Sequence, residues 1–219
     1  MFQVLACGAA IVTLSMGIRH GFGLWLQPIT QAMGWTRESF ALALAIQNIA
    51  WGLVGVFAGM AADRFGAFRV LVVGAILYGL GLVGMALSPT TLLFALTTGL
   101  LIGAAQAGTT YAVIYGVLGR QIAPEKRSWA MGVAAAAGSF GQFLMLPVEG
   151  FLISSLGWQD ALLALSLLVL LIIPLALGLR EPGFRGAAPA QRSQTVGQAL
   201  AEAVRTPSFT LLTLGYFVC

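Results

Sequence analysis

The chain has 219 residues, of which 59% are hydrophobic and only 8% are charged, and its mean hydropathy is +0.93. Because soluble domains carry about 25% charged residues, this composition excludes an ordinary soluble domain and indicates a protein surrounded mostly by lipid. The net charge of +4 does not indicate nucleic-acid binding, since the basic residues fall in short gaps between apolar runs and form no basic face. Neither cysteine, Cys7 or Cys219, has metal-ligand spacing, so we expect no metal site and no other cofactor.

Six apolar runs are long enough to cross a membrane, for which about 20 mostly apolar residues are needed. The predicted spans cover residues 4–31, 40–61, 68–87, 91–119, 128–155 and 161–179. The first run has no basic start and is too long for a cleavable signal peptide, so we interpret it as a true span. The expected fold is therefore an all-α membrane protein in which residues 1–180 form a six-helix bundle.

The remaining residues contain a polar stretch and the start of a further apolar run. Residues 181–206 are predicted to be a cytoplasmic linker, with a short surface helix over 196–204, and residues 207–219 are predicted to begin a seventh span. Orientation follows from the basic residues, which favour the cytoplasmic side. If the N-terminus is cytoplasmic, the following lie inside, and only Arg37 lies outside: Arg64, Arg69, Arg120, Lys126, Arg127, Arg180, Arg185, Arg192 and Arg205. We therefore expect a multi-pass protein of a bacterial inner membrane with a cytoplasmic N-terminus.

The loop after the second predicted span carries a recognisable motif. The stretch from Gly59 to Arg69 closely resembles the major facilitator superfamily signature Gly-x-x-x-Asp-Arg-x-Gly-x-x-Arg. Gly59 is expected to let helices approach and Gly66 to permit a tight turn, while Asp63 caps the next helix or pairs with a basic residue. The resemblance implies that Gly59, Asp63, Arg64, Gly66 and Arg69 form a cytoplasmic gate motif. The family has twelve spans, so the chain resembles an N-terminal half whose C-terminal six-helix half is missing.

Within that superfamily the chain is most similar to monocarboxylate and oxalate/formate-type porters. The resemblance rests on Gly21-Phe-Gly-Leu-Trp-Leu-Gln-Pro28, on the loop Gly34-Trp-Thr-Arg37, and on the segment from Lys126 to Gly138 that opens the fifth span. Two departures count against a proton-coupled drug antiporter. The fourth span lacks the arginine of many family members, and the fifth retains only Pro147 and Gly150 of the antiporter pattern Gly-Pro-x-x-Gly-Gly.

The resemblance also implies that spans one and four line a central path and that spans three and six face lipid. Polar residues indeed gather in spans one, two, four and five, and we take the following as substrate-binding or cavity candidates: Arg19, His20, Gln27, Gln106, Thr109, Tyr111, Gln142 and Glu149. A cation near the middle of a span costs about 2.5–3.5 kcal/mol on insertion scales. Arg19 is therefore expected either to bind a carboxylate or to form a structural pair with Glu149 or with helix carbonyls.

The function predicted from these features is secondary active transport of a small organic anion, a monocarboxylate above all, by alternating access. His20 is a candidate for carrying a coupling proton, because its charge changes near neutral pH. Uptake or efflux of another small solute, such as a drug or a sugar, and an inactive half-transporter remain open as alternatives. The sequence contains no phosphate loop or nucleophile constellation, so we do not expect an enzyme. The expected partners are the substrate, the lipid bilayer and the missing half.

Overall fold

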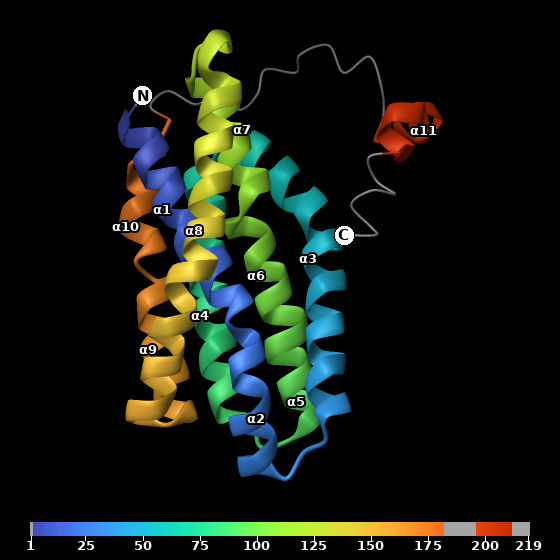
Figure 1. The fold of residues 1–219 in the computed structure, drawn as a ribbon. Coiled ribbons are helices and arrows are strands. Elements are labelled where there is room, and N and C mark those ends of the chain that lie inside the picture. The colour runs from blue at the N-terminus through green and yellow to red at the C-terminus, as the bar shows by residue number, and fades with distance from the viewer. Residues whose placement is uncertain (1, 182–195, 212–219) are drawn as a thin grey trace. The chain divides into compact units, whose positions relative to one another are not determined.

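The computed structural model describes residues 2–181 and 196–211. The chain divides into two compact units, residues 1–186 and 187–219, and the described residues of both are helical and contain no strand. The first unit is a bundle of six spans that are long and apolar enough to cross a membrane (Figure 1). The predicted all-α fold with six spans is thus confirmed.

Span one consists of α1 (Phe2–His20) and α2 (Phe22–Met33), span two of α3 (Arg37–Phe65), and span three of α4 (Ala67–Leu87). Span four consists of α5 (Thr91–Phe94), the π-helix η1 (Ala95–Leu101), α6 (Ile102–Thr109) and α7 (Tyr111–Gln121). Span five is α8 (Pro124–Leu156), and span six consists of α9 (Trp158–Val169) and α10 (Ile172–Leu177). Their ends differ from the predicted ones by four residues at most. In the second unit α11 covers Val196–Arg205, where the surface helix was predicted, and residues 207–211 are helical. The parts of the predicted linker and seventh helix at 182–195 and 212–219 lie outside the described residues.

Short caps and turns separate the spans. The Thr36 hydroxyl accepts a hydrogen bond from the Ser39 backbone N–H at 3.3 Å and thereby caps α3. Three glycines in turns, Gly34, Gly66 and Gly157, have positive φ angles of 65°, 89° and 81°. Only glycine adopts this backbone conformation readily, so these residues end α2, α3 and α8 sharply and let the chain reverse direction.

The most extensive helix contact of the bundle is that of α1 with α8, and glycine makes this contact possible. A Cβ atom at Gly141 would overlap the backbone of Thr13, and one at Gly17 would overlap the Met145 side chain. The Thr13 hydroxyl also donates to the Ala137 carbonyl across the contact at 2.9 Å. Small residues let membrane helices approach closely, and in this pair Gly17 and Gly141 are those small residues.

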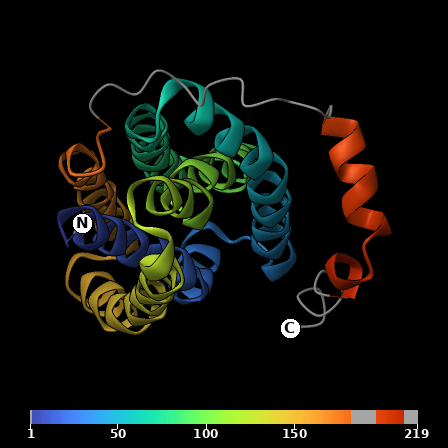
Figure 2. The ribbon, with the colours of Figure 1, turned by 90° about the horizontal axis from the view of Figure 1, so that it is seen from above.

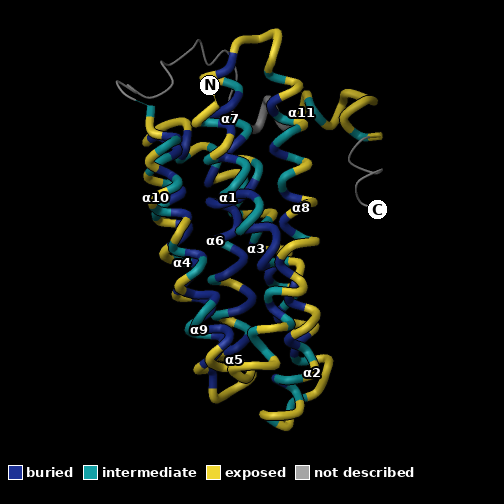
Figure 3. The backbone as a smooth tube through the Cα atoms, turned by 60° about the vertical axis from the view of Figure 1, so that its left-hand side comes forward, coloured by how far each residue is buried: buried dark blue, intermediate teal, exposed yellow. Residues whose placement is uncertain are grey.

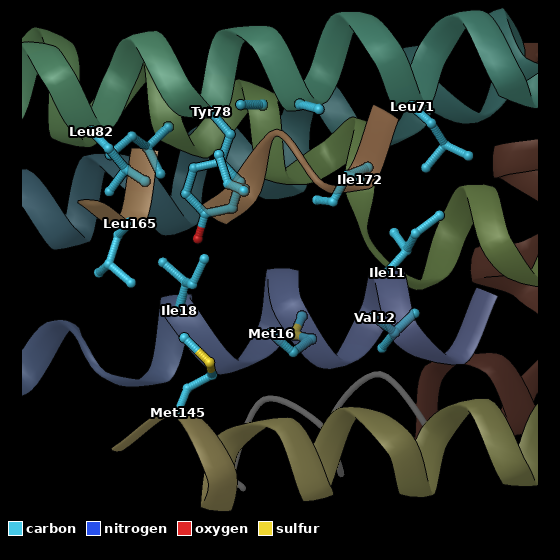
Figure 4. Close-up of a cluster of buried hydrophobic side chains, with 14 of the residues drawn as sticks. Ile11, Val12, Met16, Ile18, Leu71, Tyr78, Leu82, Met145, Leu165 and Ile172 are labelled. Carbon is cyan, nitrogen blue, oxygen red and sulfur yellow. The ribbon is translucent and has the colours of Figure 1, made fainter. Parts of the chain in front are cut away.

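Apolar side chains fill the space between α1, α4 and α8. Figure 4 shows Ile18 of α1 between Tyr78 of α4 and Met145 of α8, all of them almost fully buried. The α4 helix also packs against α6 and α9. The π-helix η1 lies against α3, where the Gln47 amide donates to the Thr98 carbonyl at 2.9 Å. This packing fixes the middle of spans one and four.

The two most exposed spans are α3 and α8. Only 22% of the most apolar window of each is buried, compared with 50% for α4. Seen from above, α3 and α8 stand on different sides of the bundle, and the exposed positions of α8 follow its outer face (Figures 2 and 3). Span three, which we expected to face lipid, packs against three neighbouring spans and also keeps Val73, Ile76 and Leu80 exposed. From residue 70 to residue 87 its side chains are apolar apart from Tyr78, and such a sequence suits a protein core as well as it suits lipid.

Candidate functional site

Span four is broken near the middle of the bundle, and span one is disturbed there at a single residue. Helix α1 ends at His20 and α2 begins at Phe22, so that Gly21 forms the joint between them. The Gly21 backbone keeps right-handed helical angles, φ −71° and ψ −11°, and its N–H donates to the Gly17 carbonyl at 3.2 Å. In span four, α6 ends at Thr109 and α7 begins at Tyr111, because Thr110 has an extended backbone with φ −113° and ψ −162°. Interrupted helices at membrane depth are characteristic of binding sites in transporters. The structure places the Thr110 break of span four and the Gly21 joint of span one beside polar side chains.

Arg19 lies two residues before the Gly21 joint of span one and points towards α3. Its Nη2 atom donates to the Asn48 side-chain oxygen, and its Cζ atom lies 4.3 Å from the ring centre of Trp51. The Asn48 amide in turn donates to the Leu44 carbonyl at 2.8 Å, which fixes the orientation of the Asn48 side chain. The half-buried guanidinium is thus held by one amide and one aromatic face, an arrangement that cation–π attraction stabilises.

Trp51 connects Arg19 to the break in span four. Its indole N–H donates to the Thr110 hydroxyl at 3.1 Å, and this hydroxyl donates to the Gln106 carbonyl at 2.8 Å. The indole ring is therefore fixed at one edge while its face contacts the guanidinium. Three spans meet in this contact, and we call Arg19, Asn48, Trp51 and Thr110 the arginine cluster.

Arg19 and Glu149 do not pair. Within the described residues the ion pairs are those of Arg120 with Asp63 and Glu181, and Arg19 has no carboxylate partner. Its Nε atom is buried and has no hydrogen-bond partner. Glu149 is fully buried on α8, where Oε2 accepts a hydrogen bond of 2.8 Å from the Trp25 indole. The structural pair that we considered for these two residues is therefore absent.

The other cavity candidates divide into an exposed and a buried group. His20 and Gln27 are exposed, and the His20 Nδ1 atom lies 3.1 Å from the Met16 carbonyl. Gln27 also lines an open pocket of about 540 Å³ between α2 and the start of α3. Tyr111 and Gln142 are half-buried, and the Tyr111 ring lies 5.3 Å from that of Tyr115.

Gln106 and Thr109 belong to the buried group. The Gln106 amide donates to the Tyr78 hydroxyl at 3.3 Å, and the Thr109 and Ser15 hydroxyls lie 2.9 Å apart. Both side chains are completely buried between α1, α4 and α6. They hold helices together in this structure and do not line an open surface, contrary to our expectation from the stripe of polar residues along span four.

A second polar cluster lies at the end of the bundle that carries the signature motif. Arg120, at the end of α7, donates from Nη1 to Asp63 at 2.7 Å and from Nε and Nη2 to Glu181 at 3.1 and 3.3 Å. Asp63 therefore has a basic partner, one of the two roles predicted for it. We call Asp63, Arg120 and Glu181 the end cluster, which joins the ends of α3, α7 and the sixth span.

The other residues of the signature motif make fewer contacts than Asp63 does. Gly66 makes the predicted tight turn, with its φ of 89°, and Arg64 stacks on the Phe65 ring at 5.3 Å. Arg69 is exposed. A Cβ atom at Gly59 would meet no neighbour within 4 Å, so the close helix approach that we predicted at Gly59 is absent from the described residues.

The sequence interpretation missed the contacts of Trp25 and Trp51. Both lie well inside their spans, away from the ends where tryptophan is enriched in membrane proteins. A buried indole N–H needs an acceptor, so a tryptophan at this depth signals a polar neighbour. That signal identifies the residue but not the acceptor, which here is Thr110 for Trp51 and Glu149 for Trp25.

Comparison with known proteins extends this structural description. Residues 5–219 match the Major Facilitator Superfamily. The chain is 30% identical to monocarboxylate transporter 11 of Mus musculus over 98% of its own length and 49% of that protein. It is 30% identical to an MFS-type efflux pump of Mycolicibacterium smegmatis, over 76% of the chain and 38% of the pump. It is 25% identical to the oxalate:formate antiporter of Oxalobacter formigenes, over 97% of the chain and 50% of the antiporter.

The chain thus spans about half the length of these relatives, or less. The family match extends over the six spans, the signature motif and the interrupted helices described above. Six membrane-capable helices together with this match indicate an integral, multi-pass membrane protein. The chain belongs to the Major Facilitator Superfamily.

Proposed function

We propose that this chain forms one half of a secondary transporter for a small organic anion, with monocarboxylates as the substrate class. The observation that carries the proposal is the arginine cluster, in which a half-buried guanidinium has only neutral partners. An unneutralised cation in the membrane is costly, and a site that keeps one is suited to an anionic ligand. A guanidinium can offer a carboxylate two parallel hydrogen bonds.

The surroundings of Arg19 support this assignment. Asn48 and Trp51 orient the side chain without neutralising its charge, and both are themselves held by further hydrogen bonds. The Gly21 joint and the Thr110 break lie on two of the three spans that contribute to the cluster, where relative motion of helix segments can open and close a path. We propose that His20, Gln27, Tyr111 and Gln142 line this path, since each is at least partly exposed.

Alternating access needs a second structural half, and we propose that a C-terminal six-helix bundle completes the transporter. The relatives named above support this, since each is at least about twice as long as this chain. The exposed spans α3 and α8 are the surfaces available for that contact. We place the end cluster in the cytoplasm, because arginine and lysine concentrate at that end of the bundle.

The test is uptake of labelled formate, acetate, lactate and oxalate into vesicles that contain the transporter with both halves. Vesicle orientation is established by labelling Glu125→Cys with an impermeant maleimide, which should react only from the cytoplasmic side. We expect saturable uptake of at least one of these acids, with competition by the others. A neutral sugar or a cationic drug transported in their place would instead support the alternative of a transporter for another small solute.

We further propose that the end cluster acts in the cytoplasmic gate and not in substrate contact. Asp63 lies 15 residues from Asn48 on the same helix, which is about 22 Å at 1.5 Å per residue. Asp63→Asn should therefore lower the turnover rate several-fold and leave the substrate affinity nearly unchanged. Its effect on stability should be small, about 1 kcal/mol or less, because Asp63 is largely exposed.

The matched control is Asp160→Asn, which changes an exposed acidic residue at the opposite end of the bundle and should leave turnover unchanged. Rates and affinities come from uptake measured over a range of substrate concentrations. A large loss of affinity with normal turnover in Asp63→Asn would show that the end cluster belongs to the substrate site.

A further inference from the structure

Glu149 is a buried carboxyl group for which the proposed anion site has no use. Its side chain is 0% exposed, and it lies on α8 where α8 faces the joint between α1 and α2. Oε2 accepts the hydrogen bond from the Trp25 indole at 2.8 Å, while Oε1 is buried without any partner. One oxygen of the carboxyl group therefore accepts a hydrogen bond, and the other has no hydrogen-bond partner.

No cation compensates a charge at this position. The elements around Glu149 carry a small set of titratable or charged side chains: Cys7, Arg19 and His20 on α1, Arg69 and Tyr78 on α4, Tyr111, Tyr115 and Arg120 on α7, Glu125, Lys126 and Arg127 on α8, and Asp160 on α9. Helix α2 carries none, and Arg69 is exposed near the start of α4. Arg19 points to Asn48 and Trp51, Arg120 binds Asp63 and Glu181, and His20 contacts the Met16 carbonyl. Within the described residues Glu149 thus has no ion pair.

Burial of an unpaired carboxylate is costly, whereas the neutral acid is far less so. The vacant Oε1 can take a proton without loss of an existing hydrogen bond, because Oε2 remains the acceptor for Trp25. Trp25 belongs to α2, on the far side of the Gly21 joint from Arg19. The indole therefore connects this carboxyl group to the segment that moves if the joint bends.

Access to the carboxyl group depends on the same joint. A Cβ atom at Gly21 would overlap the Glu149 carboxylate, so the backbone of the joint lies directly on this group. With the carboxyl fully buried, a proton can enter or leave only when the packing between Gly21 and α8 opens. Arg19 and His20 immediately precede the joint, so opening at Gly21 also displaces the proposed anion site.

From these contacts we propose that Glu149 is the proton-binding site of the transporter, loaded and released through movement at the Gly21 joint. The coupling role of Glu149 rests on the proposed transport function, whereas the capacity of Glu149 to bind a proton does not. The proton adds to Oε1 and is released from the same atom, and no other bond forms or breaks. Loading neutralises the buried charge and favours the closed packing, while release favours the open one.

The proton site is tested on the 219-residue chain itself by infrared spectroscopy during a pH titration. We expect a C=O stretching band of a protonated, buried carboxylic acid, which Glu149→Gln should abolish. Trp25→Phe should shift the band to higher frequency by removing the hydrogen bond to Oε2. The control Asp160→Asn should leave the band unchanged, and circular dichroism confirms that each variant is folded. Persistence of the band in folded Glu149→Gln, or its absence from the wild type, would overturn the proposal.

The coupling role is tested in vesicles that contain both halves, with labelled lactate as the probe. Under an imposed pH gradient, Glu149→Gln should lose accumulation above the external concentration but retain exchange of internal for external lactate. Accumulation at the wild-type level would refute coupling through Glu149. If lactate is not transported at all, the proposed function fails for this acid, and the infrared measurement decides on the proton site by itself.

Discussion

Arg19→Lys should weaken carboxylate binding at least about tenfold, although the positive charge is retained. A lysine ammonium cannot make the two parallel hydrogen bonds of a guanidinium, and it cannot reproduce the flat contact of Arg19 with the Trp51 ring. The loss of one hydrogen bond to a charged group corresponds to about 1.5–3 kcal/mol, or roughly 10- to 100-fold in affinity. Arg19→Gln, which also removes the charge, should abolish binding, as measured by titration with the acid that is transported best.

The control is Arg205→Lys, which makes the same change at an exposed arginine of α11 and should leave affinity unchanged. Because Arg19 and Glu149 are not paired, combining Arg19→Gln with Glu149→Gln should not restore expression or stability beyond the sum of the single changes. A folded Arg19→Gln protein that binds carboxylates normally would remove Arg19 from the site. Mutual rescue in the double variant would instead support a structural ion pair.

Gly141→Ala should be the most destabilising single-methyl change in the bundle interior. The added Cβ atom would overlap backbone atoms of Thr13, which cannot rotate away as a flexible side chain can. The helices α1 and α8 would have to separate, and the bond from the Thr13 hydroxyl to the Ala137 carbonyl would be strained. Overpacking of this kind typically costs about 1–3 kcal/mol, which should lower the thermal midpoint of the chain in detergent.

Gly150→Ala, on the same helix, is the matched control. A Cβ atom there meets no neighbour within 4 Å, and alanine favours a helix over glycine by about 0.5–1 kcal/mol. The thermal midpoint should therefore stay constant or rise in Gly150→Ala while it falls in Gly141→Ala. Equal effects of the two substitutions would show that α1 and α8 are not in close backbone contact.

Hydropathy predicted the spans because the physical requirement is simple. A run of apolar residues must be helical to cross a membrane, since no water is available to the backbone, and turn residues such as Gly66 mark its ends. The same reasoning could not assign neighbours. The glycines of the apolar span α4 let α6 and α9 pack closely against it, while Val73, Ile76 and Leu80 of the same helix stay exposed. Hydrophobic sequence does not distinguish a lipid surface from a protein core in a membrane protein.

Polarity identified residues of the candidate site but not their contacts. Arg19 and Glu149 were recognised because ionisable groups are rare within a membrane. The partners of Arg19 are Asn48 and Trp51, and the partner of Glu149 is Trp25. These partners lie on other helices, whose relative rotation the sequence does not specify. For the same reason Gln106 and Thr109 were expected on a cavity wall, whereas they bond to Tyr78 and Ser15 in the packing between helices.

The π-helix of span four changes how distances along this span should be counted. An α-helical turn uses 3.6 residues, whereas a π-helical hydrogen bond closes over one residue more than an α-helical one. Residues on the two sides of Ala95–Leu101 that share a face are thus further apart in sequence than α-helical periodicity implies. The π-helix thus accommodates one residue more than an α-helical turn at the same place in the span would. Loss of one residue there would restore α-helical geometry, whereas the same deletion in α4 would rotate everything beyond it by about 100°.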